Sequence, residues 1–295
     1  MRWAQDAPKV TASTRMVLTE PRHPFLVRIW GARGSLPVSG DQFRIFGGNT
    51  TCVEVRCGDS VLLFDAGSGL LPAGSALKSE GIRAAHLFLS HCHYDHIIGL
   101  PFFPLLFDAE ASVEIWSGHL AGKMTTAEMI GSFMRPPWMP IGLGVCRSGL
   151  VTHDFQSGDE LHPYAGVAIR TTSLNHPGGA IGYRVDWAGR SVAIITDVEH
   201  TPGVLDPEVL RLIEGCDLFL YDCSYVEEEM ERYRGYGHSS WHQAVLLAQK
   251  AKVQQVGCIH HAPCRTDAEL LTSEIQAKGI FPGAFFGRDG QVISL

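Results

Sequence analysis

Short runs of apolar and β-branched residues, each bounded by Gly, Asp or Asn, recur along the chain. Runs of this length and composition predict β-strands. They cover 25–30, 51–56, 60–64, 86–90 and 113–116 in the first half, and 167–174, 180–186, 191–196, 218–221, 256–259, 284–286 and 291–294 in the second. Three segments instead place apolar residues at helical spacing, namely 207–214, 242–252 and 267–277. Strands are therefore expected to outnumber helices.

The predicted strands form two batches, with no linker or low-complexity tract between them. This pattern favours an α/β architecture in which two packed sheets are flanked by helices. A chain of 295 residues has room for one large domain or two smaller ones. We expect a single domain over 25–295, preceded by an N-terminal extension over 1–24 that lacks the apolar core of a secretion signal.

Composition and charge narrow the range of functions. The 24 Lys and Arg residues against 31 Asp and Glu residues give a formal charge of -7, so the chain lacks the positive field that attracts nucleic acid. The longest apolar stretch, 97–107, is interrupted by Gly99, Pro101 and Pro104 and is too short for a membrane span. We expect a cytoplasmic protein with neither nucleic acid nor a membrane as its partner.

The segment 118–149 is apolar but irregular. It contains Met124, Met129, Phe133 and Trp138 without a clear helical or strand period. Two interpretations are open: the segment packs as a buried loop, or it forms a wall or lid over a substrate cleft.

The strongest chemical signal is the sequence His-Cys-His-Tyr-Asp-His at 91–96, directly after a predicted strand. At a strand end, residues two apart project to the same side, so His91 and His93 can bind one metal ion. Asp95 and His96 follow as the chain turns, and they point toward a second ion. The spacing therefore predicts a metal site with two ions.

This motif resembles the signature of the metallo-β-lactamase fold superfamily, and the resemblance extends over nearly the whole chain from about Val27. It implies the four-layer αββα sandwich of that family. It also implies that His176 completes a three-histidine site, that Asp197 bridges both metals, and that Asp65 supports the ligand loop from behind. The full set of candidate ligands is His91, His93, Asp95, His96, His176, Asp197 and His260.

Two assignments have alternatives. His261 competes with His260 for the last ligand position, and the place of His260 relative to its strand and to the upstream motif fits better. His200 is either a partner that supports the ligands or a solvated side chain, and the sequence favours neither.

Further residues indicate which branch of the superfamily the chain resembles. Asp197 stands where some branches have a cysteine ligand, which argues against a true β-lactamase, and His93 stands where the oxygen-reducing di-iron branch has glutamate. The sequence Gly-His-Ser-Ser at 237–240 is similar to the Gly-His-Ser-Thr element of tRNase Z and related phosphodiesterases. In that family the histidine serves the leaving group and a carboxylate orients it. Here these residues are His238 and Asp222, the latter standing where the family has glutamate.

The resemblance implies a binuclear metal-dependent hydrolase, and we expect a phosphodiesterase that acts on a small phosphodiester such as a cyclic nucleotide. In this hypothesis Asp95 orients the attacking water or takes its proton, and His238, held by Asp222, protonates the leaving group. The alternatives are a tRNase Z-like endoribonuclease, a thioester or lactone hydrolase, and a metal-binding sensor module without turnover. Zn is the expected metal, Mn and Fe suit the same ligands, and a homodimer is compatible with the sequence.

Overall fold

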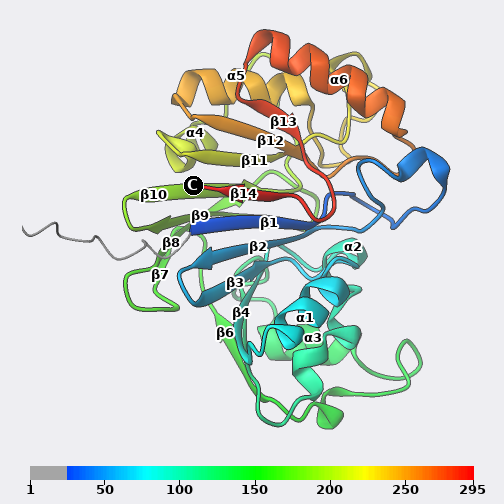
Figure 1. The fold of residues 1–295 in the computed structure, drawn as a ribbon, viewed down its shortest axis with the longest axis vertical. Coiled ribbons are helices and arrows are strands. Elements are labelled where there is room, and N and C mark those ends of the chain that lie inside the picture. Colours follow the sequence, from blue (N-terminus) through cyan, green and yellow to red (C-terminus); the bar gives the residue numbers. More distant parts are fainter. Residues whose placement is uncertain (1–24) are drawn as a thin grey trace, which may run out of the picture.

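The structure is a computed structural model that describes residues 25–295. Residues 1–24, interpreted above as an extension, lie outside the described residues. Two seven-stranded sheets pack face to face, and helices cover the outer face of each sheet (Figure 1). The four-layer αββα sandwich expected from the sequence is therefore confirmed.

The first sheet has the strand order β14-β1-β2-β3-β4-β5-β6. Its members are β14 (Val292–Ser294), β1 (Phe25–Gly31), β2 (Cys52–Cys57), β3 (Ser60–Phe64), β4 (Ala84–Leu89), β5 (Ser112–Ser117) and β6 (Gly149–Asp154). From β3 to β6 the neighbours are parallel, and the remaining pairs are antiparallel. The continuous apolar runs in β3 and β4 suit these strands because both of their faces are covered.

The second sheet has the order β13-β12-β11-β10-β9-β8-β7. Its members are β13 (Ala284–Phe286), β12 (Gln255–Ile259), β11 (Leu218–Asp222), β10 (Arg190–Ile195), β9 (Ala180–Trp187), β8 (Ala168–Leu174) and β7 (Glu160–Leu161). Here β10 to β13 are parallel, and β7 to β10 are antiparallel. Each sheet thus contains one block of parallel strands, whose carboxyl ends lie at one edge.

Helices cover the two outer faces. Those on the first sheet are α1 (Leu70–Ser79) and α3 (Thr126–Phe133), and those on the second are α4 (Pro207–Ile213), α5 (Trp241–Ala251) and α6 (Asp267–Ile280). A single turn, α2 (Tyr94–Ile97), follows β4, and short 3-10 turns occur at Asp41–Phe43, Leu100–Phe102, Pro104–Phe107, Leu143–Val145 and Glu227–Glu229. Among the described residues, no helix has both the length and the apolar content needed to cross a membrane.

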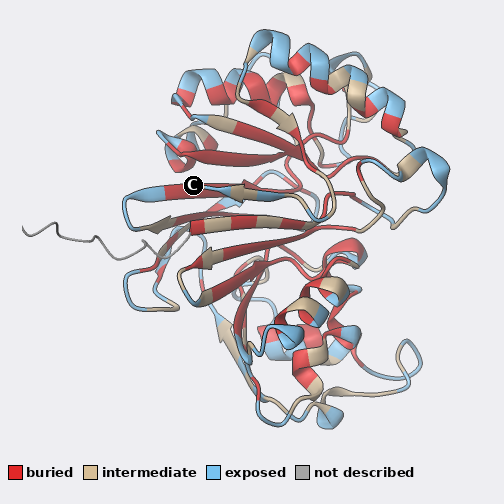
Figure 2. Cartoon of the chain, in the orientation of Figure 1, coloured by how far each residue is buried: buried red, intermediate tan, exposed pale blue. Residues whose placement is uncertain are grey.

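The buried residues form three apolar layers, one between the sheets and one beneath each set of helices (Figure 2). Between the sheets, the rings of Phe64, Phe88 and Tyr183 pack together. The Tyr183 hydroxyl donates a hydrogen bond of 2.6 Å to the carbonyl of Leu89 at the end of β4. This bond ties the second sheet to the strand that carries the histidine motif.

The sequence predicted the central strands and α4 to α6, but it missed α1, α2, α3, β6 and β7. α1 was hidden because Pro72 and Gly74, which are poor helix formers, interrupt its pattern. α3 was hidden because it is short, although Thr125 and Glu128 form a capping box at its start. The segment 118–149 is therefore partly regular, which corrects the expectation of an irregular stretch.

Candidate metal centre

The candidate ligands come together at the carboxyl ends of strands from both sheets. His91 and His93 follow β4, His176 follows β8, Asp197 follows β10, and His260 follows β12 directly. Ligand sites of α/β proteins form at this edge because the loops that leave parallel strands converge there. The site therefore lies where the corresponding edges of the two sheets meet.

Four residues of this region adopt the left-handed backbone conformation, with φ of 62° at Ser35, 61° at Asp65, 51° at Asp197 and 60° at His260. Residues other than glycine rarely adopt it, and surrounding contacts must stabilise it. Strain of this kind is typical of functional sites.

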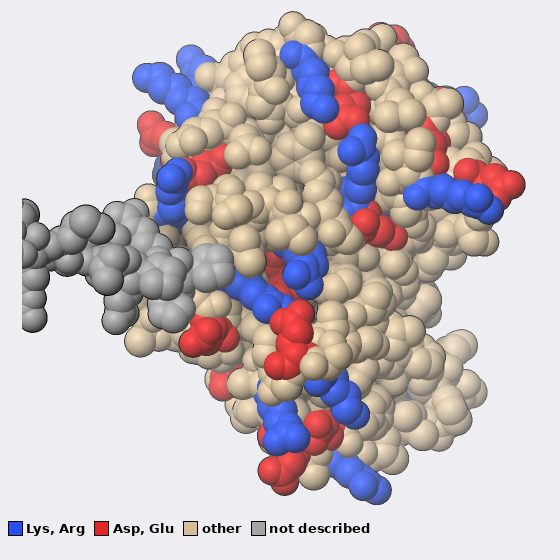
Figure 3. All heavy atoms as spheres, viewed as in Figure 1, with Lys and Arg blue, Asp and Glu red and all other residues tan. Residues whose placement is uncertain are grey.

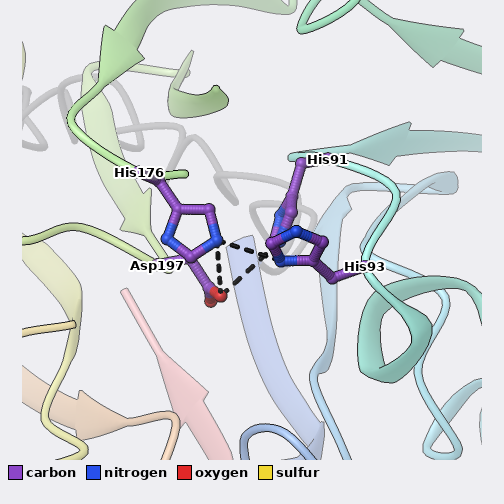
Figure 4. A group of neighbouring side chains, drawn as sticks. All are labelled: His91, His93, His176 and Asp197. Atoms are coloured by element: carbon purple, nitrogen blue, oxygen red, sulfur yellow. Dashed lines mark hydrogen bonds and ion pairs between the residues drawn. The ribbon is translucent and has the colours of Figure 1, made fainter. Parts of the chain in front are cut away.

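The first cluster consists of His91, His93, His176 and Asp197, whose potential ligand atoms all lie within 4.8 Å of one another (Figure 4). Nε2 of His176 lies 3.0 Å from Nδ1 of His93. Oδ2 of Asp197 lies 3.6 Å from Nε2 of His91 and 3.6 Å from Nε2 of His176. Three imidazoles and one carboxylate oxygen therefore face a common point.

The second cluster consists of Asp95, His96, Asp197 and His260. Here the other oxygen of Asp197, Oδ1, lies 3.1 Å from Nε2 of His96 and 2.9 Å from Nε2 of His260. Oδ2 of Asp95 lies 3.2 Å from Nε2 of His260. Each oxygen of Asp197 thus faces a different cluster, which is the arrangement that a bridging carboxylate needs.

The residues present fit a pair of cations. Nε2 of His91 is buried and has no hydrogen-bond partner among the described residues, and an unsatisfied buried polar atom is costly. Burial disfavours charge on His260, yet Asp197 and Asp95 raise its pKa to about 10. These carboxylates therefore favour positive charge at the site, and neutral imidazoles with carboxylates are common ligands of Zn²⁺.

Hydrogen bonds behind the clusters orient the imidazoles. Asp65 accepts from Nδ1 of His96 at 2.8 Å and from the backbone N–H of Ser90 at 2.7 Å. His176 donates through Nδ1 to the carbonyl of Gly237 at 2.8 Å. In both imidazoles the other nitrogen, Nε2, is left to face its cluster, as is typical of metal-binding histidines.

His238 and Asp222 lie next to the second cluster. Nδ1 of His238 donates to Oδ2 of Asp222 at 2.8 Å, and both residues group with Asp197 and His260. Burial alone would lower the pKa of His238, but the Asp222 carboxylate raises it above its ordinary value. The aspartate that stands in place of the family's glutamate is long enough to pair with the histidine.

The structure distinguishes between the alternatives that the sequence left open for His260, His261 and His200. His260 lies in the second cluster, whereas His261 donates through Nε2 to the carbonyl of Gly287 at 3.0 Å and stacks on Phe286. His200 is buried, and its Nδ1 lies 2.6 Å from the Ser239 hydroxyl. It is therefore a partner of the loop that carries His238 and is not a solvated side chain.

The sequence analysis did not identify several residues that contact the candidate ligands. The backbone N–H of Ser35 donates to Oδ2 of Asp95 at 2.7 Å, and the Ser224 hydroxyl lies 3.0 Å from Nδ1 of His260. A Cβ at Gly34 would lie 2.1 Å from the His260 ring. The only signal in the sequence was the Gly-Ala-Arg-Gly run after the first strand, since glycines there indicate a close approach of the backbone.

A cavity of about 780 Å³ opens onto the clusters. Its lining residues come from the loops around the clusters and from the segment 118–149: Ser35, Cys92, His93, Tyr94, Asp95, Ile97, Leu120, Met124, Met129, Ser132, Phe133, Trp138, His176, Pro177, Asp197, Tyr236 and His238. The segment 118–149 therefore forms a wall of the cavity, one of the two interpretations left open by the sequence.

Comparisons with known proteins identify the family of the chain. The family model described as "Beta-lactamase superfamily domain" matches residues 61–261. Ribonuclease Z of Treponema pallidum is 24% identical over 291 residues, covering 83% of this chain and 91% of that protein. Ribonuclease Z of Thermococcus gammatolerans is 22% identical over 272 residues, covering 76% and 82%.

Solved structures share the fold at low identity. The metallo-β-lactamase fold protein YhfI from Bacillus subtilis superposes with a TM-score of 0.69 at 18% identity, covering 92% of this chain and all of that one. A diphosphatase of the PhnP family gives 0.66 at 18%, covering 92% and 97%. Zn²⁺-bound PqqB from Methylobacterium extorquens gives 0.69 at 14%, covering 92% and 100%. The chain belongs to the metallo-β-lactamase superfamily, with proteins named ribonuclease Z among its distant relatives.

Proposed function

We propose that the protein is a binuclear metal-dependent phosphodiesterase that acts on a small phosphodiester such as a cyclic nucleotide. The observation that carries this proposal is the His238–Asp222 pair beside the second cluster. An alkoxide is a poor leaving group unless it receives a proton as the bond breaks. The pair provides a histidine held by a carboxylate at 2.8 Å, facing the same cavity as the clusters.

In this proposal His91, His93 and His176 would hold the first ion, Asp95, His96 and His260 would hold the second, and Asp197 would contribute to both. Zn²⁺ suits this set of nitrogen and oxygen ligands, as do Mn²⁺ and Fe²⁺. When bound, such a pair of ions supplies Lewis-acid polarisation of the phosphoryl group and an activated water.

In this proposal two side chains, those of Asp95 and His238, carry out the proton transfers. Asp95 lines the cavity and accepts a hydrogen bond from the Ser35 backbone, which fixes its carboxylate. We assign it to orient the attacking water or to accept its proton. His238 is tied through Nδ1 to Asp222, so its other nitrogen, Nε2, is the one available to protonate the leaving oxygen.

Charge favours a small substrate over an RNA. The formal charge of the chain is -7, and on the face drawn in Figure 3 the basic side chains are interspersed with acidic ones. Proteins that bind nucleic acid gather basic residues on one face. The second candidate is a tRNase Z-like endoribonuclease, which is supported by the relatives named ribonuclease Z.

A hydrolysis panel tests the proposal. Cyclic nucleotides, aryl phosphodiesters, lactones, thioesters and precursor tRNA are assayed with the protein loaded with Zn²⁺ or with Mn²⁺. We expect turnover of the small phosphodiesters. Cleavage of precursor tRNA alone would establish the second candidate, and turnover confined to lactones or thioesters would refute both. A fully metal-loaded protein with no turnover on the panel would indicate a sensor module.

A further inference from the structure

We propose that, among small phosphodiesters, the cavity selects those that carry a single phosphate and an apolar, preferably aromatic, group, and that the segment 118–138 binds this group. This inference rests on the proposed function for the identity of the phosphate group. The cavity is one continuous space: His93, Asp197 and His238 line one part, and Leu120 and Trp138 line another. A phosphate at the clusters therefore leaves its ester group within reach of the segment 118–138.

The wall that faces the clusters is apolar and partly exposed. Trp138 is 70% exposed and Met124 is 42% exposed, although both line the cavity together with Met129 and Phe133. Large apolar side chains grouped at the surface of a cavity are typical of a binding site. Removing their surface from water would contribute to binding.

The part of the wall formed by α3 is anchored at the start of that helix. At the start of α3, Thr126 donates through its backbone N–H and through its hydroxyl to Oδ1 of Asp154, at 2.6 Å and 2.7 Å. Thr125 and Glu128 complete a capping box at the same end. A pre-formed pocket avoids the entropy cost of ordering a loop.

The charges of the lining residues explain why we expect the ligand to carry only one phosphate group. Among the described residues, those that line the cavity include no lysine and no arginine. Apart from the imidazole of His238 and the thiol of Cys92, the polar side chains of the lining outside the clusters are hydroxyls, such as those of Ser132 and Tyr236. A second phosphate placed at the segment 118–138 would meet no lysine or arginine among these lining residues, so its desolvation would not be compensated. An apolar ester group meets matching surface instead.

Binding of phosphonates tests the pocket without relying on turnover. Methyl-, phenyl- and 1-naphthylphosphonate share one head group, and their carbon–phosphorus bond is not a phosphodiester linkage. Titration calorimetry on the Zn²⁺-loaded protein should show affinity rising from methyl to naphthyl by about tenfold to a hundredfold, the range that apolar pockets give for small size differences. Equal affinities would overturn the inference.

Substitutions in the segment 118–138 test whether its side chains cause the preference for the naphthyl compound. Trp138→Ala and Met124→Ala should each reduce the naphthyl preference several-fold, and Trp138→Phe should retain most of it. Both side chains are exposed, so their loss should leave the fold intact. Ile275→Ala, a substitution of a 71% exposed residue on α6, is the control and should leave the preference unchanged. A preference that survives both alanine variants would overturn the assignment to the segment 118–138.

Kinetics separate this inference from the proposed function. A series of p-nitrophenyl phosphodiesters keeps one leaving group and varies the second ester group from methyl to naphthyl, with a phosphorylated alkyl group as the charged member. We expect kcat/KM to rise with apolar size and to fall for the charged member. Hydrolysis without this trend would refute the inference alone. Naphthyl-selective binding without hydrolysis of any diester would refute the proposed function alone.

Discussion

Nδ1 of His238 donates to Oδ2 of Asp222 at 2.8 Å, and the same aspartate accepts from the Ser224 hydroxyl through Oδ1, also at 2.8 Å. The Ser224 hydroxyl in turn lies 3.0 Å from Nδ1 of His260. Asp222 thus links the proposed acid to a proposed metal ligand through one buried carboxylate. The position of the imidazole of His238 relative to the second cluster is fixed by these contacts.

His238→Ala should slow hydrolysis of a diester with an alkyl leaving group by roughly 10²- to 10⁴-fold, the usual scale of general acid catalysis. The p-nitrophenolate ion leaves without needing a proton, so the variant should keep much of its activity on bis(p-nitrophenyl) phosphate. Parallel assays of the two substrates, with elemental analysis of metal content, check this. Equal losses on both substrates, or loss of metal, would contradict the acid role.

Asp222→Asn should reduce turnover of the alkyl diester because the amide no longer stabilises the protonated imidazole of His238. The effect should be absent when His238 is already alanine, since the two residues act as a unit. A double-mutant cycle on kcat measures this coupling. If Asp222→Asn lowers kcat by the same factor in both backgrounds, Asp222 acts independently of His238.

The elements that the sequence predicted well are those with a strong local signal. Central strands such as β3 and β4 are continuous apolar runs, and the motif at 91–96 places four candidate ligands within six residues. Asp197 and His260 lie far from this motif in the chain, and only the resemblance to a family linked them to it. Their adjacency depends on how the two sheets pack, which a single sequence does not express locally.

The missed features depend on contacts between distant segments. Ser35 reaches Asp95 through its backbone N–H, so its side chain gave no chemical signal. The sequence favoured His260 over His261 by its place relative to the strand, but strand alternation does not predict the left-handed backbone at this point, with φ of 60° at His260. For Trp138 the sequence left a buried loop and a cavity wall open, because its segment has no regular period; the side chain lines the cavity.

Asp197→Ala should lower metal occupancy at both positions because each of its oxygens faces one cluster. The wild-type protein should bind two ions per chain, since seven candidate ligands exceed the four of a single tetrahedral site. Elemental analysis after metal loading measures both quantities. Asp41→Ala, which removes an exposed surface carboxylate, is the control and should keep both ions. Full occupancy in Asp197→Ala would show that the bridge is misassigned.

Neighbouring histidines should respond differently to substitution. His260→Ala should lose the second ion, because Nε2 of His260 faces Asp95 and Asp197. His261→Ala should keep both ions but lower the free energy of unfolding by about 2–4 kcal/mol, since it removes a fully buried ring and leaves the Gly287 carbonyl unpaired. Metal analysis and urea unfolding of both variants decide the matter, and the reverse pattern would place His261 in the cluster.

Gly34→Ala tests whether close backbone packing holds His260 in place. The new Cβ would lie 2.1 Å from Cε1 of the His260 ring, a distance at which the imidazole must move. We expect weaker binding of the second ion and a loss of about 1–3 kcal/mol in the free energy of unfolding, the usual cost of overpacking. Gly279→Ala, where a Cβ meets open space, is the matched control. Competition with a metal chelator measures the affinity of each ion. If Gly34→Ala binds both ions as tightly as Gly279→Ala does, the position of His260 does not depend on this contact.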